Sequence, residues 1–211
     1  MLKIWGRLNS INVEKVVWCA GELGLRFERI DAGGKFGVVD TPAFKSLNPC
    51  GKVPVIEDDG FVLWESNTIV RYLAGKYALG TLMPEEIASR AEAERWMDFQ
   101  LASLAPALSP AFRGLVRTES QKRDIDEITG SLKALGDALG IVEECLGDRP
   151  YLLGERFTVA DIPVGSIAHR WFGLPVGDVS YSRPEFPKLR AWYDRLRERP
   201  AIADIMSAPL S

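Results

Sequence analysis

The feature that most constrains this chain is a change in the spacing of its apolar residues, about one third of the way along. Before residue 78, short apolar runs alternate with one-sided helical patterns, whereas after residue 84 every apolar pattern has helical spacing. The sequence therefore predicts a mixed α/β domain over residues 1–79, a linker over 80–84 and an all-helical domain over 85–211.

The predicted order in the first domain is strand, helix, strand, an irregular segment, then two strands and a helix. The last two strands flank an acidic turn that ends in glycine, which indicates a hairpin. The predicted strands are Leu2–Trp5, Phe27–Ile30, Val53–Ile56 and Phe61–Trp64, and the predicted helices cover Val13–Leu23 and Ile69–Tyr77.

The second domain is predicted to open with Pro84-Glu85-Glu86 as a first helical turn, because proline and acids favour the start of a helix. We expect that helix to end or kink at Pro106 and Pro110, since proline cannot continue the backbone hydrogen-bond ladder. A further helix is predicted to end at Gly147. Its apolar stripe is Ile125, Ile128, Leu132, Leu135, Leu139, Val142 and Leu146, and a last helix carries Phe186, Leu189, Tyr193 and Leu196.

Charge and composition exclude several classes of function. The net charge is −3 and the pI is about 5.4, so the chain lacks the basic surface of a nucleic-acid-binding protein. His169 is the only histidine, and Cys19, Cys50 and Cys145 lie far apart, so we expect no metal site and no disulfide framework. No apolar run is long enough for a membrane span or a secretory signal. These features predict a cytoplasmic protein that acts away from membranes.

Thr158-Val159-Ala160-Asp161 has the pattern of a capping box, with aspartate in the place of the usual glutamate. In such a box, two side chains satisfy backbone N–H groups at the start of a helix. We therefore assign Asp161 a structural role rather than a catalytic one.

Polar segments next to predicted helix starts are the candidate sites. The first is Gly6–Val13, between a strand and a helix, where ligands gather in open α/β layers. Within this segment, Ser10 or Asn12 either caps the helix or faces a ligand. The sequence leaves both readings open.

Two further segments carry similar alternatives. Pro54 is either an ordinary edge-strand proline or a cis-proline that turns the backbone of Val53 outward to pair with an extended peptide. Before the third helix, the carboxylate of Glu65 can pair with an ammonium group, and the free N–H groups at the helix start can bind a carboxylate. The α-amino-acid end of a ligand carries both of these groups. The alternative for Ser66 is a simple helix cap.

Taken together, these segments resemble glutathione S-transferases, and the resemblance covers essentially the whole chain. The motifs that carry it are Ser10–Val13, Asn48–Pro54, Trp64–Ser66 and Ile69–Leu73. The first of them is most similar to the serine-type phi and theta classes. No match exists to the catalytic tyrosine or cysteine of other classes.

The resemblance implies a thioredoxin-like N-terminal domain that binds glutathione, followed by an all-α C-terminal domain. By that resemblance, Ser10 activates the glutathione thiol, with Asn12 as the competing donor. The residues implied to bind glutathione are Lys52, Val53, Pro54, Glu65 and Ser66, and Lys35 or Lys45 stands in for a basic residue that the family often supplies.

The implied reaction is attack of the glutathione thiolate on a hydrophobic electrophile or a peroxide, with glutathione as co-substrate. Phe112, Trp171 and Phe172 are expected to line the electrophile pocket. The family resemblance also implies a role in detoxification and a homodimer. Two other readings stay open: a member that binds ligands without turnover, and a glutathione-dependent isomerase, dehalogenase or lyase.

Overall fold

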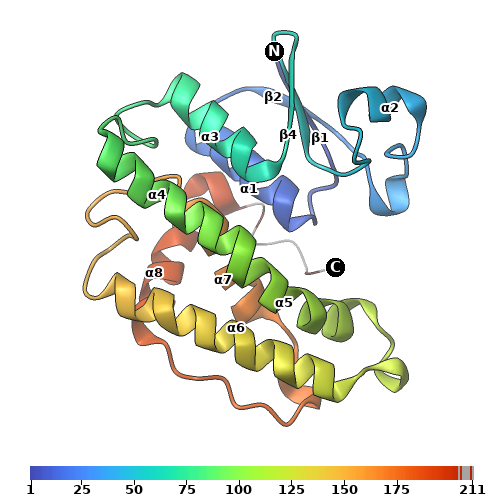
Figure 1. Ribbon diagram of the computed structural model, residues 1–211, viewed down its shortest axis with the longest axis vertical. Helices are drawn as coiled ribbons and strands as arrows, with labels where there is room; N and C mark the ends of the chain where they lie inside the picture. The colour runs from blue at the N-terminus through green and yellow to red at the C-terminus, as the bar shows by residue number, and fades with distance from the viewer. Residues whose placement is uncertain (204, 206–209, 211) are drawn as a thin grey trace.

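The computed structural model describes residues 1–203, 205 and 210, and it has a mixed α/β part and a helical part. Figure 1 shows the sheet and its helices above the longer helices of the second part. The elements of the first part are β1 (Leu2–Trp5), α1 (Ile11–Glu22), β2 (Phe27–Ile30), the 3₁₀ turn η1 (Gly34–Phe36), α2 (Pro42–Leu47), β3 (Val55–Asp58), β4 (Phe61–Trp64) and α3 (Ser66–Tyr77).

The sheet has the strand order β2-β1-β3-β4, in which β1 pairs with β2 in parallel and with β3 antiparallel. β3 and β4 form the predicted hairpin, but β3 covers Val55–Asp58 rather than Val53–Ile56. The reason lies in the turn. Asp59 and Gly60 both have positive φ, so two residues close the hairpin and the pairing continues to Asp58 opposite Phe61.

Alternate residues of the strands enter two cores, as the two-residue period of a strand requires. Ile4 and Ile56 belong to the main core, which also contains residues of α1, α3 and the helical part. Trp5 and Val55 face the other side, where they pack with Phe44 of α2 in a smaller cluster. Because α1 and α3 lie between the sheet and the helical part, α1 is covered on both sides.

The second part is helical throughout its regular elements. Ser120–Lys122 (η4), Val176–Asp178 (η5) and Pro200–Ile202 (η6) are 3₁₀ turns, and two segments are π-helical. The elements in chain order are α4 (Ile87–Phe99), the π segment η2 (Gln100–Leu104), α5 (Ala105–Phe112), the π segment η3 (Arg113–Arg117), α6 (Ile125–Leu146), α7 (Asp161–Gly173) and α8 (Pro187–Arg197).

The predicted start of the first long helix is wrong by three residues. α4 begins at Ile87 because the carboxylate of Glu86 accepts hydrogen bonds from the N–H groups of Ala88 and Ser89 and so caps the helix. The prediction that the helix ends at one of the two prolines is also wrong. The chain stays helical to Arg117 through wider π turns.

A side chain from α6 supports the backbone around Pro110. The Ser131 hydroxyl accepts from the N–H of Ala111 at 2.9 Å and donates to the carbonyl of Ala107 at 2.5 Å. Proline lacks the N–H that would extend the ladder, so this bridge holds the α5 backbone from outside the helix.

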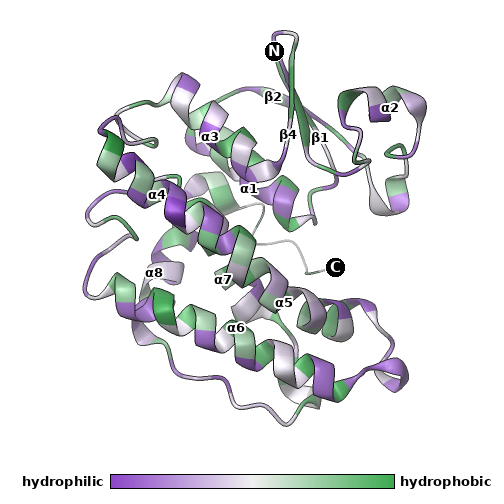
Figure 2. Ribbon diagram, viewed as in Figure 1, coloured by the Kyte–Doolittle hydropathy of each residue, from purple (hydrophilic) through white to green (hydrophobic). Residues whose placement is uncertain are grey.

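The apolar stripe predicted for α6 is buried along its length, except for Ile125, which is 43% exposed at the first turn. Figure 2 shows hydrophobic and hydrophilic residues alternating around this helix. The helix ends at Gly147, as predicted, and Gly147 has a φ of 56°. Nowhere in the described residues is a helix long and apolar enough to cross a membrane.

Candidate active site

A small cavity of about 50 Å³ lies beside the loop that precedes β3. Asn48 shapes this loop: its amide donates to the carbonyl of Lys52 at 2.8 Å, and its oxygen accepts from the N–H of Cys50 at 2.9 Å. The Val53-Pro54 peptide bond is cis, which was one of the two alternatives for this proline. The lining residues are Asn12, Asn48, Lys52, Val53, Pro54, Glu65 and Ser66.

Glu65 enters this cavity from the start of α3 with an unusual backbone. Its φ is 72°, a left-handed conformation that non-glycine residues seldom adopt and that often marks a functional position. Although Glu65 occupies the N-cap position of α3, its side chain makes no capping hydrogen bond and is exposed. The carboxylate is therefore available to a ligand in the cavity.

A larger cavity of about 330 Å³ adjoins the first, since Asn12 lines both. Ser10 also lines it and stands at the N-cap of α1, yet its hydroxyl makes no capping hydrogen bond. The Ser66 hydroxyl donates to Asn12 Oδ1 at 3.3 Å, so the amide N–H groups of Asn12 are left for other partners. Two polar donors thus stand at the junction of the cavities.

Buried charges lie behind this junction, where α1 meets the helical part. Arg170 of α7 lines the larger cavity and forms a two-pronged ion pair with Glu14 of α1, with one N···O distance of 2.6 Å. Lys15 is fully buried and donates to Asn67 Oδ1 at 2.9 Å and to Gln100 Oε1 at 3.2 Å. Burial lowers the pKa of Lys15 to about 7, while Glu65 raises it and Arg170 lowers it further.

The structure brings together most of the residues named from the sequence. Ser10 and Phe112 line the larger cavity, Asn12 lines both, and the small cavity gathers the other expected glutathione-binding residues except Lys35. Lys35 is exposed in a 3₁₀ turn, and its ammonium lies 5.1 Å from the centre of the Phe36 ring. Lys45 comes closer to the loop, with its Cε 3.8 Å from where a Cβ on Gly51 would stand.

Trp171 and Phe172 are not among the described residues that line the larger cavity, although both were expected there. Ile167 and Arg170 of α7 line the cavity. Because successive side chains on a helix point about 100° apart, the two residues after Arg170 point away from the cavity. Trp171 therefore packs against Tyr181 and Phe186, and Phe172 against Tyr193. These two aromatics belong to the core of the helical part.

Sequence reasoning missed several polar residues of the larger cavity. Arg113 and Arg117 lie four residues apart on one helical side, beside the expected Phe112, so their spacing was a usable signal. Arg7 lies in the segment already singled out. No local pattern marks Gln100 or Arg170, because their position depends on how the helices pack.

One expectation and one buried histidine concern groups outside the cavities. Within residues 1–203, 205 and 210, no three His, Cys, Asp or Glu side chains gather as metal ligands. The His169 ring nitrogen Nδ1 lies 2.9 Å from the Tyr193 hydroxyl, and burial, Arg170 and Arg197 lower the pKa of His169 to about 4. The two cavities themselves are lined by hydroxyl, amide and charged side chains, among them those of Ser10, Asn12 and Glu65.

Comparisons with known proteins agree with this geometry. Residues 1–75 match the family model for the glutathione S-transferase N-terminal domain, and residues 125–195 match that for the C-terminal domain. The chain is 38% identical over 213 residues to glutathione S-transferase GstB of Escherichia coli, with 100% of both chains covered. It is 32% identical to glutathione S-transferase F14 of Arabidopsis thaliana, over 94% of this chain and 78% of the other.

A solved structure gives the same result in three dimensions. The theta-class glutathione S-transferase of Xanthomonas axonopodis pv. citri, with glutathione bound, superposes with a TM-score of 0.93 at 45% identity. The alignment covers 100% of this chain and 99% of that one.

Proposed function

This chain belongs to the glutathione S-transferase family, and from that premise we propose that Ser10 activates bound glutathione to its thiolate. The observation that carries the proposal is the Ser10 hydroxyl, which stands at a helix N-cap without capping the helix and lines the larger cavity. The thiolate, rather than the thiol, is the nucleophile. A hydroxyl that donates to the sulfur favours the charged form and lowers the pKa of the thiol.

The small cavity supports a placement for the rest of glutathione. Glu65 binds the ammonium of the γ-glutamyl end, and Ser66 with the α3 N-terminus binds its carboxylate. Val53, ahead of Pro54, pairs with the cysteinyl backbone. Lys52 binds the glycyl carboxylate, and Lys45 replaces Lys35 as the second basic residue near this loop.

The test compares Ser10→Ala with Asn12→Ala, and Ser109→Ala on α5, which also lines the larger cavity, is the matched control. A hydrogen bond to a charged group contributes about 1.5–3 kcal/mol, so Ser10→Ala should raise the pKa of the bound thiol by roughly 1–2 units. Ultraviolet titration of the bound thiolate measures this. If only Asn12→Ala moves the pKa, then Asn12 is the activating donor and Ser10 is not.

The electrophile would bind in the larger cavity, against Phe112, and the thiolate sulfur would attack it at the junction near Asn12. Residues 80–84, between α3 and α4, would be the linker of the two domains. A cytoplasmic role in detoxification fits this activity.

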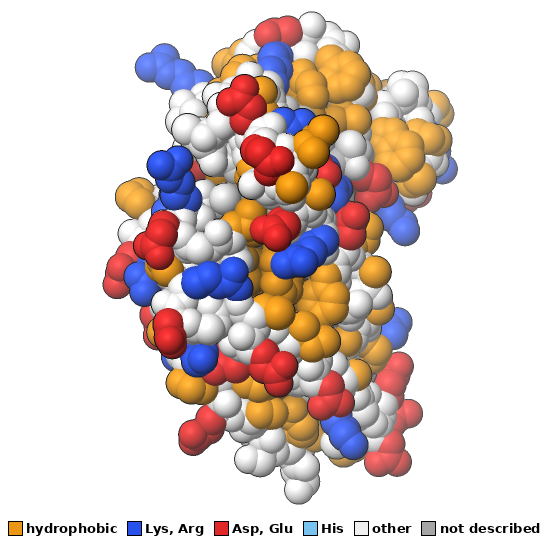
Figure 3. Space-filling view, turned by 60° about the vertical axis from the view of Figure 1, so that its left-hand side comes forward, with side chains coloured by type: hydrophobic (Ala, Val, Ile, Leu, Met, Phe, Trp, Pro, Cys, Tyr) orange, Lys and Arg blue, Asp and Glu red, His pale blue; other side chains and the backbone are white. Residues whose placement is uncertain are grey.

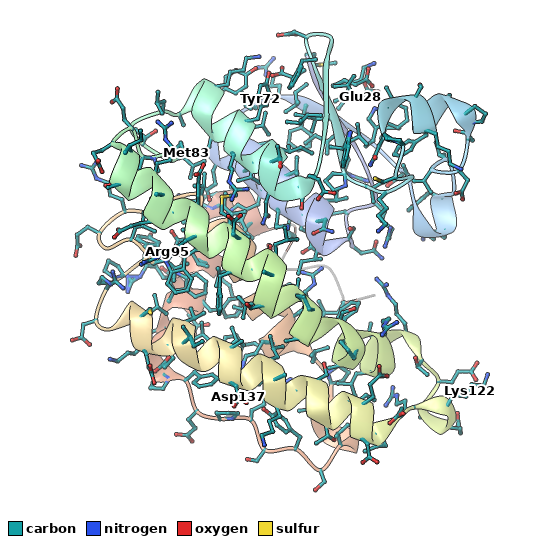
Figure 4. All side chains as sticks on the ribbon, in the orientation of Figure 1. Glu28, Tyr72, Met83, Arg95, Lys122 and Asp137 are labelled. Carbon is teal, nitrogen blue, oxygen red and sulfur yellow. The ribbon has the colours of Figure 1, made fainter. Side chains whose placement is uncertain are left out.

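We also propose that the protein is a homodimer, joined through a groove between α4 and α6. The groove has a volume of about 320 Å³ and is lined by Arg95, Trp96, Phe99, Ile141 and Cys145. Figure 3, turned toward the α4 side, shows apolar side chains gathered among charged ones, and Figure 4 labels Arg95 on α4.

Ile141 is 48% exposed in this groove, which favours burial against a second copy. Light scattering after size-exclusion chromatography should give a dimer mass, which Ile141→Asp should reduce to that of a monomer. Ile87→Asp is the control, because Ile87 is 80% exposed outside the groove. A monomer mass for the unmodified protein would contradict the proposal.

A further inference from the structure

Arg7 is a half-buried cation that the proposed reaction does not use. It lies in the turn between β1 and α1, where its N–H donates to the carbonyl of Ala32 at 3.1 Å and its carbonyl accepts from the N–H of Ser10 at 3.2 Å. Its side chain lines the larger cavity together with Ser10 and Asn12. In the part of the chain that the structure describes, the Arg7 guanidinium has no hydrogen-bond or ion-pair partner.

Two glycines let the Arg7 side chain pack against the loop that follows β2. Gly33 and Gly34 have φ values of 77° and 57°, in the left-handed region that favours glycine. A Cβ on Gly33 would stand 3.0 Å from Arg7 Nη1, and one on Gly34 would stand 3.1 Å from Arg7 Cδ and Nε. The loop backbone therefore holds the Arg7 side chain in a position that larger residues would disturb.

This packing places the Arg7 charge beside the cysteine of the proposed glutathione. Val53, which is proposed to pair with the cysteinyl backbone, has its Cγ2 3.4 Å from where a Cβ on Gly33 would stand. Ser10, which is proposed to donate to the sulfur, closes the same turn as Arg7. Arg7 lines the larger cavity and is not among the described residues that line the small one. The guanidinium is thus on the side of the sulfur rather than on that of the γ-glutamyl end.

The other charges near the larger cavity place the Arg7 guanidinium more closely. Burial lowers the pKa of Arg117, and the charge of Arg7 lowers it further, so the two guanidinium groups interact across the cavity that both residues line. Among the described residues, the charged side chains at this cavity besides Arg7 are Arg113 with its neighbour Glu127, Arg117, and Arg170 with its partner Glu14.

We propose that Arg7 is a second catalytic residue, whose guanidinium donates to the sulfur of bound glutathione and stabilises the thiolate beside Ser10. This inference rests on the proposed function, because it needs glutathione bound with its sulfur in the larger cavity. In the step concerned, the S–H bond breaks, the proton passes to solvent and the sulfur keeps the electron pair. Arginine keeps its charge at every pH at which the enzyme works, so its effect on the sulfur does not depend on its own titration.

Ultraviolet titration of the thiolate in the complex with glutathione tests the proposal. Arg7→Gln should raise the pKa of the bound thiol by roughly 1–3 units, as the loss of a nearby opposite charge does. Arg7→Lys keeps a positive charge and should recover part of that shift. Arg26→Gln removes an exposed arginine on the strand side of α1 and should leave the pKa of the thiol unchanged.

Titration calorimetry with two ligands separates the sulfur from the carboxylates of glutathione. S-methylglutathione carries the same carboxylates but forms no thiolate, so Arg7→Gln should leave its affinity unchanged. The affinity for glutathione, measured above the pKa of the bound thiol, should fall about ten- to hundredfold. Equal losses for the two ligands would overturn the inference, since Arg7 would then hold a carboxylate.

A pair of glycine variants tests how Arg7 is positioned. Gly34→Ala should push the guanidinium away without removing its charge, and should raise the pKa of the bound thiol less than Arg7→Gln does. Gly37→Ala is the matched control, because Gly37 lies in the same loop with a φ of 60° and a Cβ there would meet nothing within 4 Å. A rise from Gly34→Ala that persists in the Arg7→Gln background would overturn this positioning role.

The outcomes distinguish this inference from the proposed function. An unchanged pKa of the bound thiol in Arg7→Gln, with glutathione still bound, would overturn the inference and leave the role of Ser10 standing. A shift in Arg7→Gln with none in Ser10→Ala would support the inference and overturn the assignment of Ser10. A protein that binds no glutathione would overturn both.

Discussion

At the scale of single residues, Lys15 is the most unusual group in the molecule. Its side chain is fully buried between α1, α3 and η2, and within the described residues it donates hydrogen bonds to the amide oxygens of Asn67 and Gln100. Asn67 in turn donates to the carbonyl of Met97 at 2.8 Å. A buried cation without a directly bonded carboxylate is costly, and this cost makes stability depend on pH.

We predict that the free energy of unfolding rises with pH above about 7 because of Lys15. Burial lowers the pKa of Lys15 to about 7 from its ordinary value of 10.5, a value that the unfolded chain regains. Between these values the unfolded chain binds more protons than the folded one, so the folded state gains stability as pH rises. Below pH 7 the full cost of the buried cation is present.

Urea unfolding at about pH 7 and about pH 9 measures the effect, and Lys15→Met removes the titrating group while keeping an unbranched side chain. The rise in the free energy of unfolding should be smaller in the variant. Equal rises in the two proteins would show that the Lys15 ammonium keeps its proton throughout this range.

Glu65 carries a second prediction at this scale. Glu65→Gln should weaken glutathione binding roughly ten- to hundredfold, because charge-assisted hydrogen bonds contribute about 1.5–3 kcal/mol. Titration calorimetry measures the affinity. Glu28→Gln changes an exposed acid on β2 and should leave the affinity as it was. Unchanged binding in Glu65→Gln would remove Glu65 from the site.

The residues that sequence reasoning found and those that it missed differ in a physical way. Ser10 and Glu65 stand beside helix starts, where the local sequence itself indicates a binding position. Lys15 and Arg170 look like ordinary helix-surface charges until another element covers them. Their burial comes from packing between distant segments, which local spacing does not report.

At the scale of elements, only one half of the predicted capping box forms before α7, because the Thr158 hydroxyl accepts from the N–H of Ala160 rather than from that of Asp161. Asp161 accepts from the N–H of Thr158 at 2.9 Å, as the box requires, and it also accepts from the N–H of Leu152 and the indole of Trp192. Burial raises the pKa of Asp161 to about 6, while these donors lower it. One carboxylate thus joins the loop before α7, the start of α7 and α8.

Asp161→Ala should lower the free energy of unfolding by about 3 kcal/mol or more, because each buried donor left without a partner costs about 1–3 kcal/mol. Urea unfolding followed by circular dichroism measures the loss. Asp148→Ala removes a fully exposed carboxylate and should cost less than about 1 kcal/mol. Similar losses in the two variants would mean that water satisfies the donors around Asp161.

Local sequence patterns predicted which helices and strands form more accurately than they predicted where each one begins and ends. Leu2–Trp5, Phe27–Ile30 and Phe61–Trp64 are strands with the predicted bounds, because their apolar runs and flanking turns are local signals. The start of α4 was misplaced because proline and glutamate compete for the first positions, and the Glu86 cap prevails. The helix through Pro110 was missed because its support comes from Ser131 on another helix.

At the scale of the whole molecule, charged pairs cross the boundary between the two parts. Glu14 of α1 pairs with Arg170 of α7, with both side chains buried, and Glu22 pairs with Arg199 at 2.5 Å. Figure 1 shows α1 between the sheet and the helices of the second part. The two parts are therefore joined by specific partners as well as by apolar packing.

Glu14→Ala should cost about 3–5 kcal/mol of stability, because it leaves the Arg170 charge buried without its partner. Glu119→Ala is the control, since its pair with Lys122 is exposed and such pairs contribute about 0–1 kcal/mol. Thermal and urea unfolding measure both. A double variant with Glu14→Met and Arg170→Met should recover much of the loss, and no recovery would mean that shape at this position matters more than charge.

The ion pair between Glu14 and Arg170 also has a consequence for how such chains can recombine. One partner is encoded near the start of the sequence and the other near its end, so neither part alone contains a satisfied pair. A chimera that joins the first part of this chain to the helical part of a relative would inherit a mismatched charge unless the relative also carries an arginine there. Whether the two parts of such a chimera are compatible therefore depends on the residues at two positions that are 156 residues apart.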